Sequence, residues 1–179
     1  MKSRMYLATA LRIAEKIVEL LKPYCFRIEI AGSIRRGQEI VGDIEIVCIP
    51  KPYEVGLFTN GLAGVVNEWI KVKGELEYGK SRYTKRILPA SIIGQEGKMV
   101  QLDLFFAEEG NWGNILLIRT GDWEFSKKFV SLLPQRGYAQ NEGWLWYKGK
   151  TIPCPEEIDL FKRAGLSYIE PKNRNANSI

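Results

Sequence analysis

The chain has 179 residues and a mass of 20.5 kDa, and its 26 lysines and arginines outnumber its 21 acidic residues by five, giving a formal net charge of +5. This length suits one domain or two small subdomains, and an apolar content of 45% is enough to build a hydrophobic core. The sequence has no histidine, which excludes a Ser-His-Asp triad, a Cys-His pair and any His-ligated metal site. Catalysis by this chain therefore has to rest on carboxylates, lysine, arginine, serine or cysteine.

The cysteine spacing and the hydropathy indicate a cytoplasmic protein. Cys25, Cys48 and Cys154 are widely separated, which favours buried thiols over a zinc cluster or a disulfide framework. The longest aliphatic run, 115–118, is far shorter than the roughly 20 residues of a membrane span. We therefore expect a soluble, cytoplasmic chain with no membrane partner.

The predicted elements of the first half alternate between helices and strands. In chain order they are a helix over 7–21, a strand over 26–31, a strand over 43–49 and a helix from 62 that Gly74 closes. Pro23 ends the first helix, and Gly32-Ser33 begins a turn or a helix N-terminus directly after the first strand.

The second half predicts further strands and a smaller unit of helices and a hairpin. Its elements are strands over 83–93 and 99–106, helices over 111–120 and 122–135, an aromatic hairpin over 138–147 and a short helix over 156–164. The whole pattern predicts an α+β fold in which a mixed sheet is followed by a helix-plus-hairpin unit. The predicted subdomains are 1–109 and 110–179.

Three carboxylates are the most informative residues of the first half. Asp43 and Glu45 lie two positions apart on a predicted strand, so their side chains project from the same face. Oxygen-only ligands of this kind favour Mg²⁺ or Mn²⁺. Asp103 lies mid-strand and completes the site if its strand pairs beside the first. Three such acids can bridge two cations about 3.5–4 Å apart, as in two-metal phosphoryl transfer.

The basic loop before these acids, 32–37, has the composition of a phosphate-binding turn. The glycine lets the backbone approach a phosphate closely, and a helix N-terminus directs N–H groups toward it. Ser33 adds a hydroxyl donor, and Arg36 can form two parallel hydrogen bonds to phosphate oxygens. Taken singly, each feature has a structural explanation, because an acid pair on a strand is usually solvated and Gly-Ser is a common turn. Together, the loop and the acids predict a site for a metal triphosphate.

These motifs resemble the nucleotidyltransferase superfamily and, more specifically, the family X DNA polymerases. The resemblance spans about 26–174 and consists of G-S-x-R-R-G, G-D-I-E-I-V, Q-L-D-L-F-F, Arg119-Thr120-Gly121, Asp159-Leu160-Phe161, Gly165-Leu166 and the stretch 168–174. It implies a nucleotidyltransferase palm, with a mixed sheet and flanking helices, followed by a small helix-plus-hairpin thumb. It also implies a magnesium-dependent DNA polymerase, with Mn²⁺ as an alternative metal, that fills gaps in DNA repair.

The resemblance assigns roles to the matching positions. Asp43, Glu45 and Asp103 bind the catalytic metals, with Asp103 nearest the primer 3′-hydroxyl. The positions at the β and γ phosphates of the incoming deoxynucleoside triphosphate are Gly32, Ser33, Arg36 and Gly42. The positions at its sugar and at the minor groove are Arg119, Thr120, Gly121 and Ser126.

Basic residues in both halves predict salt-sensitive contacts to the phosphates of a gapped or primer-template DNA. The candidates are Lys80, Arg82, Lys85, Lys127 and Lys128. Trp123 lies beside the turn at the nucleotide sugar, where it either stacks on the base or packs in the core at a helix start.

The sequence also departs from the family pattern. The second acid is usually Asp rather than Glu45, the residue two before the third acid is commonly Arg rather than Gln101, and Ile118-Arg119 replaces an aromatic pair.

About 25 residues precede the palm, so we expect neither a lyase domain nor a fingers domain, as in the minimal viral member of the family. We also expect a monomer. Such a protein would act in the host cytoplasm if viral, or at the nucleoid if bacterial.

Two alternatives stay open at this point. One is a nucleotidyltransferase that acts on a non-DNA acceptor, or a terminal transferase that ignores the template; this enzyme would keep the same acids. The other is a non-catalytic module that binds DNA ends, in which Glu45, Gln101 and Ile118-Arg119 would reflect loss of catalysis. Metal-dependent binding of a nucleoside triphosphate separates this module from both enzymes.

Overall fold

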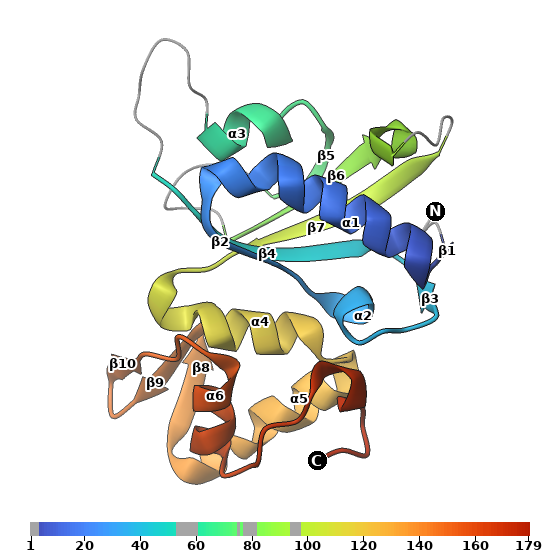
Figure 1. Ribbon diagram of the computed structural model, residues 1–179. Helices are drawn as coiled ribbons and strands as arrows, with labels where there is room; N and C mark the ends of the chain where they lie inside the picture. Colours follow the sequence, from blue (N-terminus) through green and yellow to red (C-terminus); the bar gives the residue numbers. More distant parts are fainter. Residues whose placement is uncertain (1–3, 53–60, 75, 77–81, 94–97) are drawn as a thin grey trace. The chain divides into compact units, whose positions relative to one another are not determined.

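The chain forms two compact units, 1–106 and 107–179, each with its own hydrophobic core (Figure 1). The computed structural model describes residues 4–52, 61–74, 76, 82–93 and 98–179. The predicted division, between 109 and 110, falls three residues after the observed one (109 − 106 = 3).

The first unit is built on a five-stranded mixed sheet in the order β2-β4-β7-β6-β5. Its strands are β2 (Cys25–Ile30), β4 (Ile44–Pro50), β5 (Ile70–Lys73), β6 (Tyr83–Pro89) and β7 (Met99–Phe106). The central strands β4 and β7 run parallel, and the other neighbouring pairs run antiparallel. A separate short ladder joins β1 (Met5–Tyr6) to β3 (Ile40–Val41). The predicted α+β class with a mixed sheet is therefore confirmed.

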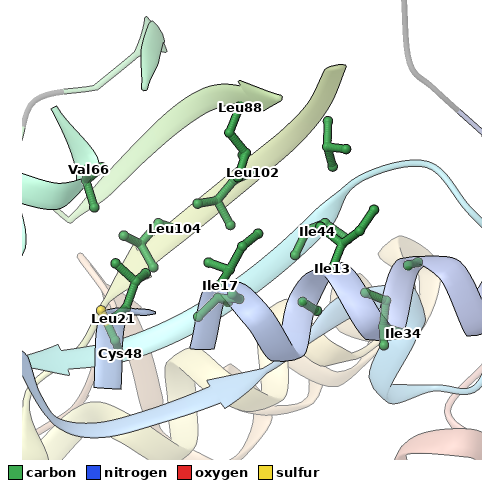
Figure 2. Packing of buried hydrophobic residues seen from close by; sticks show 14 of the residues in the cluster. Ile13, Ile17, Leu21, Ile34, Ile44, Cys48, Val66, Leu88, Leu102 and Leu104 are labelled. Carbon is green, nitrogen blue, oxygen red and sulfur yellow. The ribbon is translucent and has the colours of Figure 1, made fainter. Parts of the chain in front are cut away.

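Helix α1 (Leu7–Leu21) covers one face of this sheet. Its fully buried residues recur every three or four positions and are Ala10, Ile13, Ala14, Ile17 and Leu21. Figure 2 shows Ile13 and Ile17 packed toward Ile44, Leu102 and Leu104 of the central strands. Burying each such side chain contributes about 1.5–3 kcal/mol. This packing commits one face of β4 and β7 to the core and leaves their other face for the polar residues.

The predicted helix from 62 to Gly74 is wrong in its second half. Helix α3 (Gly61–Val66) ends early, and the next residues form the edge strand β5. In this strand Ile70 lies opposite Ile87 of β6. The alternation of Ile70 and Val72 with lysines suits a strand, and pairing with β6 outweighs the helical spacing.

Two other element boundaries shift because of proline. The strand predicted over 83–93 ends at Pro89, where a 3-10 helix over 90–93 begins. The helix predicted over 122–135 ends at Leu132, two residues before Pro134 opens another 3-10 helix. Pro134 has no backbone N–H, so it cannot donate the next α-helical hydrogen bond, and this accounts for the early stop.

The second unit packs three helices against a small antiparallel sheet. The helices are α4 (Trp112–Thr120), α5 (Trp123–Leu132) and α6 (Glu157–Ala164), and the strands are β8 (Tyr138–Asn141), β9 (Trp144–Tyr147) and β10 (Lys150–Ile152). The predicted aromatic hairpin is β8 and β9, and β10 is an unpredicted third strand. The hydrophobic core of the second unit includes Phe125, Phe129 and Phe161.

All three cysteines are buried free thiols, as predicted. The hydrogen bond between Cys25 and Cys48 lowers the pKa of Cys25 and raises that of Cys48, whereas burial raises the pKa of Cys154.

No helix in the described part of the chain has the length and apolar character needed to cross a bilayer. The first unit also contains the short helix α2 (Gly32–Arg35), which belongs to the candidate site.

Candidate active site

The strand pairing on which the site prediction depends is present in the first unit. Parallel strands β4 and β7 are hydrogen-bonded neighbours, and Glu45 lies directly opposite Asp103. Partners in register project from the same face of a sheet, so both acids lie on the face away from α1. Ile44 and Leu102, one position earlier on each strand, are fully buried on the core face. Asp43 lies just before β4, two residues from Glu45, where alternation directs it to the same face.

Gln101 links two of the three predicted carboxylates. Its side-chain amide Nε2 donates to Oδ2 of Asp43 at 3.3 Å and to Oδ2 of Asp103 at 3.0 Å. One amide group thus lies within hydrogen-bonding distance of an acid before β4 and an acid within β7. Asp43 and Asp103 are therefore brought together beside the start of β4.

Asp103 is the most buried of the three acids, with 5% of its surface exposed, and β6 supplies two further partners. The Lys85 ammonium lies 3.3 Å from Oδ1 of Asp103, and the Tyr83 hydroxyl donates to the same oxygen. Lys85 is also the register partner of Asp103 across β6 and β7. A buried carboxylate is costly unless it is paired and hydrogen-bonded, and these three donors satisfy that requirement.

Glu45 points toward the phosphate-loop motif rather than toward Asp103's partners. A β-carbon built on Gly32 would lie only 1.9 Å from Oε2 of Glu45 and 3.1 Å from its Cβ. Gly32 begins α2 with a positive φ of 62°, a conformation that glycine adopts without strain. The side chain of Glu45 therefore occupies the space that any residue other than glycine would need.

The chemistry of the three acids suits a hard divalent cation, because all of them offer carboxylate oxygen. Even so, no three acidic or cysteine side chains within the described residues are arranged to hold a metal ion. Lys85, Tyr83 and Gln101 contact the oxygens of Asp103. A metal ion bound at Asp103 would compete with the Lys85 ammonium for Oδ1.

The predicted phosphate loop is a short helical turn between β2 and β3. The backbone N–H of Arg36 donates to the Gly32 carbonyl, and that of Gln38 donates to the Ser33 carbonyl. Ile34 is buried in the core and anchors the turn, whereas Ser33 and Arg36 are half-buried. Gly42 directly precedes Asp43, so the turn and the acids belong to one continuous segment.

Replacing Gly32 by alanine tests the contact between this turn and Glu45. We expect a loss of about 1–2 kcal/mol in the free energy of unfolding from the positive φ, together with displacement of Glu45. Misplacement by about 1 Å can cost roughly 10²-fold in rate, so nucleotide addition should fall by that order. Denaturant unfolding and a primer-extension assay measure the two effects.

Gly149→Ala is the matched control for this variant, because Gly149 lies outside the predicted phosphate loop. Gly149 also has a positive φ, of 75°, but nothing lies within 4 Å of an added β-carbon. The control should lose similar stability and keep its activity. Equal activity losses in the two variants would mean that the Glu45 contact has no role in the reaction.

The predicted nucleotide residues of the second unit lie along the turn between α4 and α5. Thr120 ends α4 and is fully buried, and Gly121 follows as its C-cap. Ser126 is 9% exposed and its hydroxyl donates to the Ile118 carbonyl at 3.0 Å, which ties α5 to α4. The Asp122 side chain caps α5 by accepting from the Phe125 N–H at 2.7 Å.

Trp123 is an exposed aromatic residue, not a core one. Its side chain is 73% exposed at the start of α5, and the Lys127 ammonium lies 4.8 Å from its ring. Arg119 is likewise exposed, at the end of α4. An indole with this exposure can stack on a nucleobase, so the packing interpretation of Trp123 is wrong.

The predicted DNA-binding cations lie in different surroundings. Arg82 is exposed just before β6, whereas Lys85 forms an ion pair with Asp103. Lys128 is exposed and its ammonium donates to the carbonyls of Ala176 and Ile179. Lys80 lies outside the described residues.

Sequence reasoning missed the roles of Tyr83, Lys85 and Gln101 around Asp103. Tyr83 and Lys85 alternate on one strand, and Gln101 and Asp103 on another, so each pair shares a face. This alternation was the available signal. It becomes specific only when the register of β6 on β7 is known.

Comparison with known proteins identifies relatives of both units. Residues 115–175 match the DNA polymerase beta thumb family. The chain is also 24% identical over 164 residues to DNA polymerase lambda of Rattus norvegicus. Together, these two matches support a family X polymerase-like protein.

The match to the polymerase lambda relative covers 80% of this chain and 28% of that protein, so this polymerase-like chain spans just over a quarter of the relative's length. Its α+β architecture is consistent with a small nucleotidyltransferase-like palm followed by a thumb.

Proposed function

We propose that this protein is a DNA polymerase of the family X type that adds deoxynucleotides to a primer 3′-hydroxyl and fills short gaps during repair. The observation that carries the proposal is the placement of Asp103 opposite Glu45, with Gln101 joining it to Asp43. This group of acids occurs in a chain whose C-terminal part matches a polymerase thumb. Neither feature alone specifies a polymerase, but a DNA-binding thumb and an acid cluster on a nucleotidyltransferase-like sheet support one.

In the proposed reaction, the primer 3′-oxygen forms a bond to the α-phosphorus of the nucleoside triphosphate. The bond to the β-phosphate oxygen breaks, pyrophosphate leaves, and the hydroxyl proton passes to Asp103. Asp43, Glu45 and Asp103 would hold divalent metal, which when bound supplies Lewis acidity and offsets the charge that develops on the phosphate. Ser33, Arg36 and Gly42 would contact the leaving phosphates.

In the second unit we propose that the turn after α4 positions the nucleotide and the duplex. Trp123 would stack on a base, and Thr120 and Gly121 would border the sugar. Arg119 and Ser126 would contact the nucleotide or the minor groove. Lys127 and Lys128 would neutralise DNA phosphates from the exposed side of α5.

The test is extension of a labelled primer on a duplex with a one-nucleotide gap, with each deoxynucleotide offered singly in Mg²⁺ or Mn²⁺. We expect the wild-type chain to add only the complementary nucleotide and Asp43→Ala to add none. Glu29→Ala is the control, because Glu29 is an exposed acid on the same sheet. Addition that ignores the template, or DNA binding without any addition, would refute template-directed polymerisation.

The contact of Lys85 with Asp103 makes a separate prediction about metal affinity. Two unit charges about 4 Å apart interact by about 4 kcal/mol near a protein surface, and metal must displace this ammonium. We expect Lys85→Met to tighten Mn²⁺ binding about tenfold, equivalent to about 1.4 kcal/mol. Titration of free Mn²⁺ by electron paramagnetic resonance measures this affinity without any need for catalysis.

Lys73→Met is the matched control for the metal titration. Lys73 is exposed and lies opposite Lys85 on the neighbouring strand, so its loss changes the net charge equally without touching Asp103. An increase in affinity of the same size in both variants would point to general charge rather than to the ion pair. Unchanged affinity in Lys85→Met would show that its ammonium does not compete with metal.

A further inference from the structure

A second group of polar residues lies in the second unit, around an open cavity of about 540 Å³. The cavity is lined by residues at the start of β8, on α6 and in the 3-10 helix before β8, namely Arg136, Tyr138, Asp159, Lys162 and Arg163. Three of these five side chains are cationic.

The positive charge of the residues that line this cavity exceeds the negative charge near them. Asp159 supplies one negative charge, and its carboxylate already accepts from the Glu156 N–H at 3.1 Å as part of the α6 capping box. The C-terminal end of a helix such as α6 contributes about −0.5 charge. Against the three cations, a net charge of about +1.5 remains to be met by water or by an anion.

Arg163 adds a buried hydrogen-bond donor that lacks an acceptor. Its Nε–H is buried and has no hydrogen-bond partner among the described residues. The guanidinium of Arg163 lies 5.9 Å from the centroid of the Tyr138 ring. A buried donor without a partner is unfavourable, and Arg163 is one of the residues that line the cavity.

The aromatic residue in the cavity favours a phosphate over a base as the ligand. Tyr138 is occupied by the Arg163 guanidinium and by the ring of Tyr147, whose centroid lies 5.1 Å away. Its ring is therefore not available for stacking on a nucleobase. Arg136 lies against Gly165 at the end of α6, so two guanidinium groups border the cavity. Paired guanidinium groups suit the tetrahedral oxygens of phosphate.

We propose that this cavity is a phosphate-binding site, with Arg136, Lys162 and Arg163 as its ligands, that holds a backbone phosphate of bound DNA. The inference rests on the DNA binding of the proposed function and adds a contact on α6, separate in sequence from those proposed on α5. Free inorganic phosphate offers the same oxygens, so the experiment has one arm for each source.

The first arm measures binding of a fluorescent duplex as a function of salt, with Ca²⁺ in place of Mg²⁺ so that no addition occurs. Each phosphate contact contributes a slope of about −0.9 to the plot of log K against log salt. We expect the slope of the double variant R136Q/K162Q to be less negative than that of the wild type by about 0.9, the value for one phosphate contact. K150Q/K172Q is the matched control, because it removes the same charge from exposed positions of the same unit and should keep the wild-type slope.

The second arm follows the Arg163 Nε–H signal by ¹⁵N NMR, with R163K used to assign it. We expect the duplex to shift this signal, and inorganic phosphate at millimolar concentration to shift it less. A shift with phosphate alone would still support the site but would assign it to the free anion. The cavity site is refuted, and the proposed function is not, if the wild-type chain binds the duplex but two results are negative. These results are an unchanged salt slope in R136Q/K162Q and an Arg163 signal that does not move. Absence of wild-type duplex binding would instead contradict the proposed function, and the phosphate arm would then decide the cavity.

Discussion

Replacing Asp103 by asparagine is expected to lower the rate of nucleotide addition by about 10³-fold or more. The reason is that bound metal supplies several kcal/mol of charge stabilisation at the transferring phosphate, and each 1.36 kcal/mol is worth tenfold in rate. Asparagine keeps the shape of the side chain but removes the charge that would hold the metal and the carboxylate that would take the proton. Single-turnover primer extension on the gapped duplex measures the effect.

The same variant should stay folded and bind DNA. Tyr83 and Gln101 can still bond to an amide at this position, and Lys85 has a side chain that is 25% exposed and can turn toward water. Glu29→Gln makes the same change of charge at an exposed position of the sheet and should be fully active. Addition by Asp103→Asn at more than about one tenth of the wild-type rate would contradict the assignment of this acid to the metal site.

The second large effect is expected on stability, at a buried ion pair in the second unit. The Arg174 guanidinium lies 2.6 Å from Oε1 of Glu157, and their side chains are 0% and 6% exposed. Tyr168 donates to the other carboxylate oxygen at 3.1 Å, and Arg174 donates to the Ile169 carbonyl at 2.9 Å. These contacts fasten the C-terminal segment to α6.

Glu157→Gln should cost about 3–5 kcal/mol in the free energy of unfolding, because it leaves the Arg174 charge buried without a counter-charge. Tryptophan fluorescence in a denaturant titration follows the loss, since four of the five tryptophans lie in the second unit. Replacing both partners, as in Glu157→Leu with Arg174→Met, removes the buried charge and should recover most of the stability.

The exposed pair Lys16–Glu19 is the control for this prediction. It has the same 2.6 Å separation, but its side chains are 53% and 64% exposed. Glu19→Gln should therefore change the stability by at most about 0.5 kcal/mol. A comparable small change in Glu157→Gln would show that burial does not govern the strength of the inner pair.

The sequence by itself determined the features that depend on neighbours along the chain. The spacing of apolar residues in 7–21 specifies α1, since a period near 3.6 places one stripe toward the core. Alternation places Asp43 and Glu45 on one face whatever strand lies beside them. The glycine before Ser33 likewise indicates a tight turn, and that residue has a positive φ.

Only the tertiary structure decided which strands meet and in what register. A strand can pair with several partners, and a shift of one residue moves every side chain to the opposite face, so Asp103 could not be set opposite Glu45 from spacing alone. The same register brings Lys85 to Asp103, and it turns a predicted phosphate contact into a partner of the acid. Strand β5 was missed for this reason as well, because its extended form depends on pairing with β6 rather than on its own apolar spacing.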